Sequence, residues 1–106
     1  MTRGYEALVI LRAVGTERDL AQSAAQLEEV IKKVGGRIES SQGWGRRKLA
    51  FRILRQTEGY YHLVRFTAPT DRVSEVKRLY RLNEAIVRFL ILSEDDETRS
   101  PVPVNS

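Results

Sequence analysis

Along this 106-residue chain, the spacing of apolar side chains changes four times between the period of a strand and the period of a helix. Strand-like sequence covers, in order, residues 4–13, 37–54, 60–68 and 86–92. A helical pattern begins at Thr16, which can cap it, and ends at Gly35-Gly36. A second helical pattern follows Pro69, where Thr70 or Asp71 can provide the cap. The predicted order is therefore strand, helix, strand, strand, helix, strand.

This order of elements is that of the ferredoxin-like fold, which belongs to the α+β class. We expect a four-stranded antiparallel sheet with two helices on one face, formed by a single domain of residues 1–93. Gln56-Thr57-Glu58-Gly59 is interpreted as the turn between the second and third strands. Residues 94–106 form an acidic, proline-containing tail without a periodic pattern. The uncovered face of the sheet offers a docking surface for nucleic acid or protein.

The composition excludes several kinds of site. The chain has no cysteine and a single histidine, His62, which rules out disulfides and a zinc centre and makes His62 a packing or hydrogen-bonding residue. Its apolar stretches are far shorter than the ~20 residues of a membrane helix, and its start lacks the pattern of a signal peptide. No glycine-rich loop matches a nucleotide-binding motif. We therefore expect a cytoplasmic protein that is not an enzyme, has no cofactor and contacts neither a membrane nor a small-molecule substrate.

The basic residues are unevenly distributed. Lysine and arginine number 18 against 14 acidic residues, which gives a net charge of +4, and four of the acidic residues fall at 94–97. The densest basic run is 43–55, which contains five basic residues and no acidic one. A surface of this kind suits a polyanion, although an arginine-rich solvated surface has the same composition.

The basic run also contains aromatic side chains. Arg46, Arg47 and Lys48 stand between Trp44 and Phe51. The cations can neutralise phosphates and the rings can stack on bases, which are two ingredients of RNA contact. Strand alternation places neighbouring cations on opposite faces, unless the adjoining glycines bend the strand so that all three face outward. The alternative is that the apolar members belong to the core and the cations protect a strand from aggregation.

Several short motifs occur in a fixed order. They are Tyr5-Glu6, Gly35-Gly36, Trp44-Gly45-Arg46-Arg47-Lys48-Leu49-Ala50, Gly59-Tyr60-Tyr61, Phe66 with Ala68-Pro69, and Leu79-Tyr80-Arg81-Leu82 with Ile86-Val87-Arg88. In this order and spacing, residues 3–93 resemble the family of the sixth protein of the bacterial small ribosomal subunit. The chain departs from the family at Phe51-Arg52-Ile53, where the usual pattern is Tyr-Pro-Ile.

The resemblance implies a structural protein that binds the central domain of small-subunit ribosomal RNA together with the eighteenth protein of that subunit. The ribosome would be that of a bacterial cytoplasm or of an organelle. The RNA-contacting positions of the family fall on Arg3, Tyr5, Arg47, Lys48, Arg81 and Arg88 of this sequence. The basic run adds Trp44 and Arg46 as RNA-binding residues. Cations would hold phosphates and rings would stack or pack, so that these contacts position the RNA more than they read its sequence.

A second surface is expected to bind the eighteenth protein. Strand alternation places four apolar residues on the open face of the sheet as a docking patch: Leu8, Ile10, Leu63 and Leu90. Four acidic residues at the start of the tail would add charge complementarity toward a basic partner: Glu94, Asp95, Asp96 and Glu97. Both sets are therefore predicted to be partner-binding residues.

Two other functions stay open at this point. The RNA-recognition module, a binder of single-stranded RNA, shares the strand order, but Glu58–Phe66 departs from its third-strand signature at three positions. A self-associating regulatory domain would bury the open face against its own copy and bind a ligand. An enzyme of the acylphosphatase type is disfavoured, because Val14–Glu17 lacks the phosphate loop and arginine that it needs.

Overall fold

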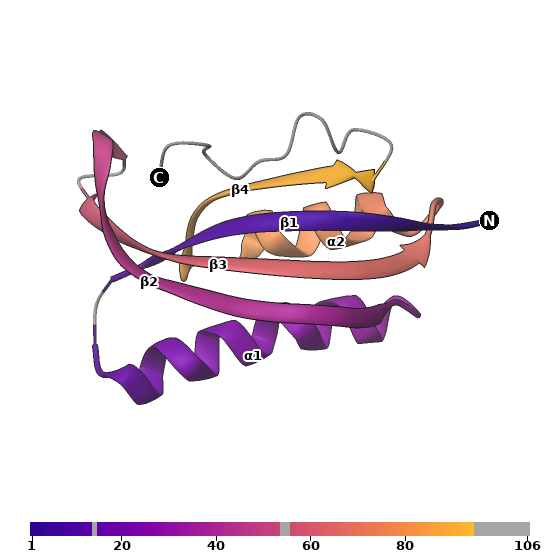
Figure 1. Ribbon diagram of the computed structural model, residues 1–106, viewed down its shortest axis with the longest axis horizontal. Coiled ribbons are helices and arrows are strands. Elements are labelled where there is room, and N and C mark those ends of the chain that lie inside the picture. Colours follow the sequence, from indigo (N-terminus) through magenta and orange to yellow (C-terminus); the bar gives the residue numbers. More distant parts are fainter. Residues whose placement is uncertain (14, 54–55, 95–106) are drawn as a thin grey trace.

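The computed structural model describes residues 1–13, 15–53 and 56–94, with their side chains except those of 49–53, 56 and 57. The elements are β1 Thr2–Arg12, α1 Glu17–Lys33, β2 Arg37–Ile53, β3 Gln56–Pro69, α2 Val73–Leu82 and β4 Ile86–Ser93 (Figure 1). The strands form an antiparallel sheet in the order β2-β3-β1-β4. The predicted ferredoxin-like fold of the α+β class is confirmed, with β1 as a central strand.

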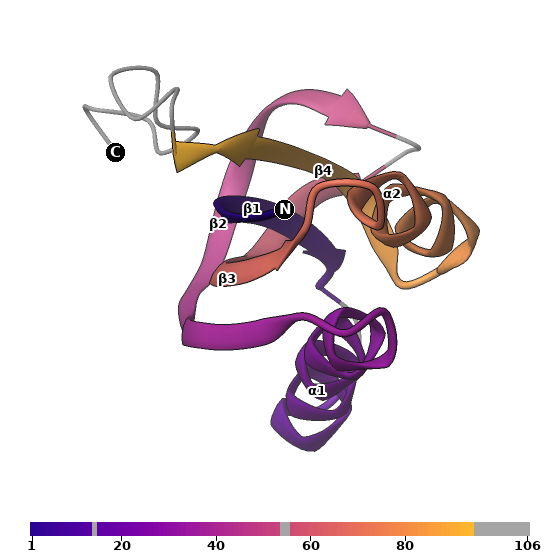
Figure 2. The same ribbon diagram turned by 90° about the vertical axis from the view of Figure 1, so that its right-hand side faces the viewer.

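Both helices pack on one face of the sheet, and no helix covers the other face within the described residues. In Figure 2, α1 lies below the strands and α2 to their right. The alternation of β1 explains this arrangement, because Ala7, Val9 and Leu11 are fully buried in the core cluster. Leu8, between them in sequence, is paired with Leu63 on β3 and with a residue of β4 on the open face.

Helix α1 begins and ends as its sequence predicts. The Thr16 hydroxyl accepts a hydrogen bond from the Asp19 amide at 3.2 Å, and the Asp19 carboxylate accepts one from the Thr16 amide at 2.8 Å. This reciprocal capping box satisfies two amides at the start of the helix. At the other end, Gly35 has φ +89°, the left-handed conformation in which helices often stop. Neither helix in the described part of the chain is long and apolar enough to cross a membrane.

The predicted cap of α2 at Thr70 or Asp71 is wrong. The helix begins at Val73, and Arg72 occupies the cap position without a side-chain hydrogen bond. The reason lies in the backbone after Pro69, whose carbonyl accepts a hydrogen bond from the Arg72 amide at 2.9 Å. Residues 70 and 71 lie within this turn, and the helix starts after it.

The predicted turn at Gln56-Thr57-Glu58-Gly59 is also wrong, because these residues belong to β3. Ile53 pairs with Gln56, and Lys48 pairs with Glu58. Residues 48–53 of β2 and 56–58 of β3 thus continue past the last pair of β1 with β3, and we call this extension the hairpin arm. Figure 1 shows it as the curved extension at the left.

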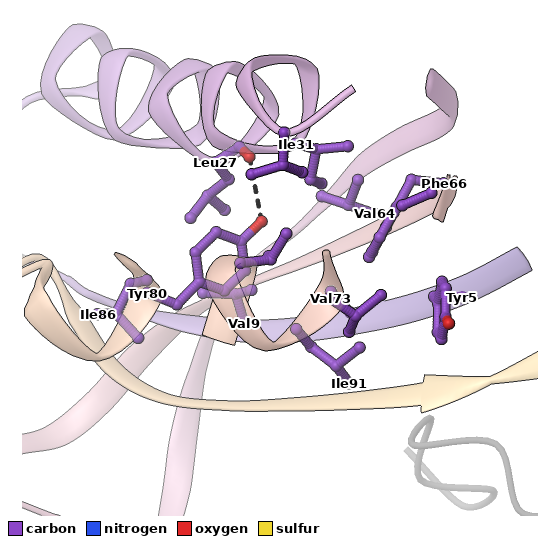
Figure 3. Packing of buried hydrophobic residues seen from close by; sticks show 14 of the residues in the cluster. Tyr5, Val9, Leu27, Ile31, Val64, Phe66, Val73, Tyr80, Ile86 and Ile91 are labelled. Atoms are coloured by element: carbon purple, nitrogen blue, oxygen red, sulfur yellow. Dashed lines mark hydrogen bonds between the residues drawn. The ribbon is translucent and has the colours of Figure 1, made fainter. Parts of the chain in front are cut away.

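Residues of β1, β3, β4 and both helices form the core, and partly buried Ile38 of β2 packs against it (Figure 3). Tyr80 of α2 is 1% exposed, and its hydroxyl donates a hydrogen bond to the Leu27 carbonyl of α1 at 3.1 Å. Its ring meets that of Phe89 edge-on at 5.5 Å. Burial raises the pKa of the Tyr80 hydroxyl, so it stays protonated and available as a donor. Tyr80 therefore joins α2 to α1 and to β4.

His62 has the hydrogen-bonding role expected for it. Its Nε2 lies 2.7 Å from the Ser41 hydroxyl, which joins β3 to β2. The residue is buried, and its Nδ1 has no partner among the described residues. Burial lowers the pKa of His62, partly opposed by the charge of Glu28 on α1. The neutral imidazole is the form that the folded protein prefers.

Acidification is accordingly expected to destabilise the fold through His62. Because the pKa is lower in the folded than in the unfolded state, the unfolded chain takes up the proton first as the pH falls below about 6.5. The free energy of unfolding should decrease until the pKa of the folded state is reached. Urea unfolding of the parent and of His62→Gln between pH 8 and pH 5 measures this, since other titrating groups cancel in the difference. An equal decrease in both proteins would contradict the assignment.

Candidate RNA and partner interface

Strand β2 carries a bulge at the glycines singled out in the sequence. Gly43 pairs with His62 and Gly45 with Tyr61, which leaves Trp44 as the extra residue of β2. Gly45 has φ +85°, a conformation that favours glycine. Trp44 is half-buried. The predicted bend is confirmed, whereas a stacking role for Trp44 stays a prediction.

The three consecutive cations lie just beyond the bulge and are all exposed. Arg46, Arg47 and Lys48 pair in unbroken register with Tyr60, Gly59 and Glu58. They therefore alternate between the two faces, and the bend does not turn all three to one side. Arg46 is tied down, because its Nη1 donates a hydrogen bond to the Ala13 carbonyl at 2.8 Å. Strand β2 therefore presents cations on both of its faces here.

Arg81 and Arg88 lie together, although they belong to different elements. Arg81 of α2 and Arg88 of β4 are exposed and line one shallow groove of about 520 Å³ between the helix and the edge strand. Lys77 lines the same groove, whose apolar part includes Phe89 and Ile91. None of the described residues that line the groove is acidic, so the groove suits an anionic ligand.

The two predicted sites at the start of β1 differ from each other. Arg3 is exposed. Tyr5 is 8% exposed and belongs to the core cluster, where its ring stacks on that of Phe66 with centroids 5.5 Å apart. Figure 3 shows Tyr5 among the buried side chains. The ring of Tyr5 therefore packs within the protein and is not free to stack on a base.

Arg12 is an interface candidate that the sequence analysis missed. Its Nε donates a hydrogen bond to the Glu84 carbonyl at 2.8 Å, and its amide bonds the Ala85 carbonyl at 2.8 Å. It pairs with Gly59, which on its other side pairs with Arg47. In the sequence, Arg12 is only a residue near the end of the predicted strand 4–13. Its neighbours become known from the strand register. Arg12, Arg47 and Arg88 thus share one end of the open face.

The predicted apolar patch forms a row across the sheet. Leu63, Leu8 and Leu90 are register partners on β3, β1 and β4. Leu63 is 6% and Leu8 8% exposed, whereas Leu90 is 47% exposed and Ile10 is half-buried. The row exists as predicted, but only Leu90 offers a large accessible apolar side chain.

The predicted acidic contact set is described only at its first member. Glu94 is exposed, and its carboxylate lies against Gly4, where a Cβ would overlap it. Asp95, Asp96 and Glu97 lie outside the described residues. Glu6, in the same region of the open face, forms an ion pair with Arg65 at 2.9 Å. No group of three side chains in the described part of the chain could hold a metal ion.

Comparisons with known proteins point to one family. The sequence model of the family described as Ribosomal protein S6 matches residues 4–93. The small ribosomal subunit protein bS6 of Campylobacter lari is 37% identical over 95 residues, which are 90% of this chain and 77% of the relative. That of Clostridium botulinum is 32% identical over 93 residues, which are 88% of this chain and 99% of the relative.

A solved structure gives the same fold. The crystal structure of 30S ribosomal protein S6 from Thermotoga maritima superposes with a TM-score of 0.84, covering 93% of this chain and 94% of that one at 23% identity. Proteins of this family are structural components of the ribosome and not enzymes, RNA binding is typical of them, and the bacterial relatives are cytoplasmic. Because the family model spans most of the chain and relatives exceed 30% identity over most of their length, the chain belongs to the ribosomal protein S6 family of the small ribosomal subunit.

Proposed function

We propose that this chain binds the central domain of small-subunit ribosomal RNA together with the eighteenth small-subunit protein. The observation that carries the proposal is that three arginine residues share one end of the open face of the sheet. Arg12 and Arg47 flank Gly59 in one row of the open face, and Arg88 pairs with Ile10 in the next. Guanidinium groups suit phosphates because their planar fork can donate two parallel hydrogen bonds.

The residues outside this end extend the proposed RNA surface. Arg46 and Lys48 lie on the opposite face of β2 from Arg47 and would extend the surface to that side, and Arg81 would extend it across the groove beside β4. Arg3 would contact phosphate at the far end of β1. Most of these contacts would fix the orientation of the RNA without reading its bases.

The partner protein is proposed to cover the open face beside the arginines. Leu90 and Ile10 provide the accessible apolar contact, and buried Leu8 and Leu63 support them from within the sheet. The acidic set that begins at Glu94 would attract a basic partner and speed its association. The domain of residues 1–93 would bind the RNA and supply the apolar part of the partner surface, and the tail from residue 94 would supply the acidic part.

Replacing Arg47 and Lys48 together by alanine is expected to weaken RNA binding and to flatten its dependence on salt. Each lost phosphate contact lowers the slope of log K against log salt by about 0.9 on duplex RNA or about 0.7 on a single strand, so the double variant should lose about 1.4 to 1.8. Filter binding of a central-domain RNA fragment across a salt series measures the slope.

The matched control is a double variant on the helical side of the protein. Lys32 and Lys33, in the last turn of α1, are both exposed and lie outside the proposed interface. Replacing them by alanine removes the same charge and should leave the slope unchanged. A folded Arg47 and Lys48 variant with the parent's slope would show that these cations do not meet phosphates.

A further inference from the structure

Tyr61 lies on the open face of the sheet, at the end where the arginines gather. Its register partners are Gly45 on β2 and Ile10 on β1. Gly59, two residues earlier on β3 and on the same face, is the next neighbour along the strand. Two of the positions around Tyr61 therefore carry no side chain. The ring, which is half-buried, is the large group at the centre of this region.

The flank of Tyr61 toward β2 is open. Among the described residues, a Cβ placed on Gly45 would meet no atom within 4 Å, so none of them fills the space above this position. The backbone of Gly45, at φ +85°, disfavours any residue with a side chain. The bulge thus keeps free the space next to the ring. By contrast, the neighbouring Tyr60 packs against the core and lies over Gly43.

Cations surround Tyr61 on the same face. Arg47 and Arg12 occupy diagonal positions, which lie about 7–8 Å away in an antiparallel sheet. Arg88 pairs with Ile10 and is two strands away, at about 10 Å. Arg12 is held in place by the Glu84 carbonyl. A flat aromatic ring with guanidinium groups around it matches the two chemical parts of a nucleotide, the base and its phosphates.

We infer that Tyr61 is a stacking platform for one unpaired base of the RNA, with Arg12, Arg47 and Arg88 meeting the flanking phosphates. The inference rests on the proposed function and adds to it that the bound RNA turns a base out of its helix at this point. A tyrosine ring stacks on every kind of base, so the site selects single-stranded geometry and not sequence. The protein partner would bind the neighbouring row of the open face, which consists of Leu63, Leu8 and Leu90.

The test uses the full chain in complex with the eighteenth protein, titrated with a central-domain RNA fragment across a salt series. Tyr61→Leu should bind about 5- to 150-fold more weakly than the parent, with an unchanged salt slope, because stacking involves no counterion release. Tyr61→Phe keeps the ring and should bind as the parent does. Thr67→Ala, on the same face of β3 but at its other end, is the matched control and should have no effect.

Two results separate this inference from the function on which it rests. If Tyr61→Leu binds RNA as the parent does while the Arg47 and Lys48 variant is weakened, the platform is wrong and the proposed function stands. If both variants bind as the parent does, both proposals fail. If Tyr61→Leu weakens the heterodimer without RNA, Tyr61 belongs to the protein interface and the platform is likewise overturned.

A measurement on the unmodified protein guards against a variant that fails to fold. Ring carbons of tyrosine are labelled with ¹³C, and the Tyr61 signals are assigned with the Tyr61→Phe variant. Stacking on a base should shift the Tyr61 ring protons upfield when the RNA fragment is added, while the signals of buried Tyr80 should stay in place. Tyr61 signals that do not move in the saturated complex would overturn the inference.

Discussion

Replacing Tyr80 by alanine is expected to lower the free energy of unfolding by about 3–5 kcal/mol, the usual cost of deleting a large buried aromatic side chain. Tyr80 is 1% exposed and links three elements, through its bond to the Leu27 carbonyl and its edge contact with Phe89. Its removal leaves a cavity between α2 and the rest of the core. Urea unfolding at neutral pH measures the change.

The conservative variant Tyr80→Phe separates the ring from the hydroxyl. It keeps the packing and loses only the hydrogen bond to Leu27, so it should cost about 0.5–1.5 kcal/mol. A loss for Tyr80→Phe as large as that for Tyr80→Ala would mean that the hydroxyl, and not the ring, carries the stability. A loss below about 1 kcal/mol for Tyr80→Ala would contradict the central place of this residue in the core.

The second large effect concerns the protein partner. Leu90→Asp is expected to weaken binding of the eighteenth protein by about 30-fold or more, because it would place an unpaired charge within an apolar contact. Leu90 is 47% exposed in the free chain, so the variant should still fold. Leu63, at 6% exposure, is unsuitable for the same change, since a buried aspartate would unfold the protein. Calorimetric titration of the purified pair measures the affinity.

Leu82 provides the control for this prediction. It is 66% exposed, lies at the end of α2 and carries the same side chain, but it stands on the helical side. Leu82→Asp should bind the partner as the parent does. Equal binding by Leu90→Asp and the parent would place the partner elsewhere, with an edge strand as the next candidate.

The fold was largely predictable because most elements contribute a regular apolar stripe to one core. β1 and α1 are examples, since β1 contributes every second residue from Tyr5 to Leu11 to the core cluster and α1 buries Leu20, Leu27 and Ile31. The two wrong predictions, the turn at 56–59 and the cap of α2, concern segments without apolar periodicity. The polar segment at 56–59 predicts a turn, whereas its residues belong to β3, with Gln56 and Glu58 paired to β2. The predicted cap of α2 is wrong because a backbone hydrogen bond to the Pro69 carbonyl closes a turn before the helix, and no side chain caps its first turn.

The candidate site was less predictable because it depends on strand register. The density of cations at 46–48 can be read from the sequence, but their neighbours cannot. Arg12 becomes relevant only once Gly59 is seen to pair with both it and Arg47. Conversely, the resemblance predicts an RNA contact at Tyr5, whereas the stacking of its ring on that of Phe66 places the ring in the core.

The pairing of β1 with β4 has a consequence for how the protein is synthesised. Leu8, near the start of the chain, completes its pairing only when Leu90 has been made. A nascent chain that ends at α2 already holds both helices, yet β1 is then an edge strand with unpaired backbone groups and apolar side chains on both faces. Edges of this kind pair readily with other chains. The interval before β4 emerges is therefore when the chain is most exposed to aggregation, and non-local pairing of this kind makes folding slow relative to a helical bundle.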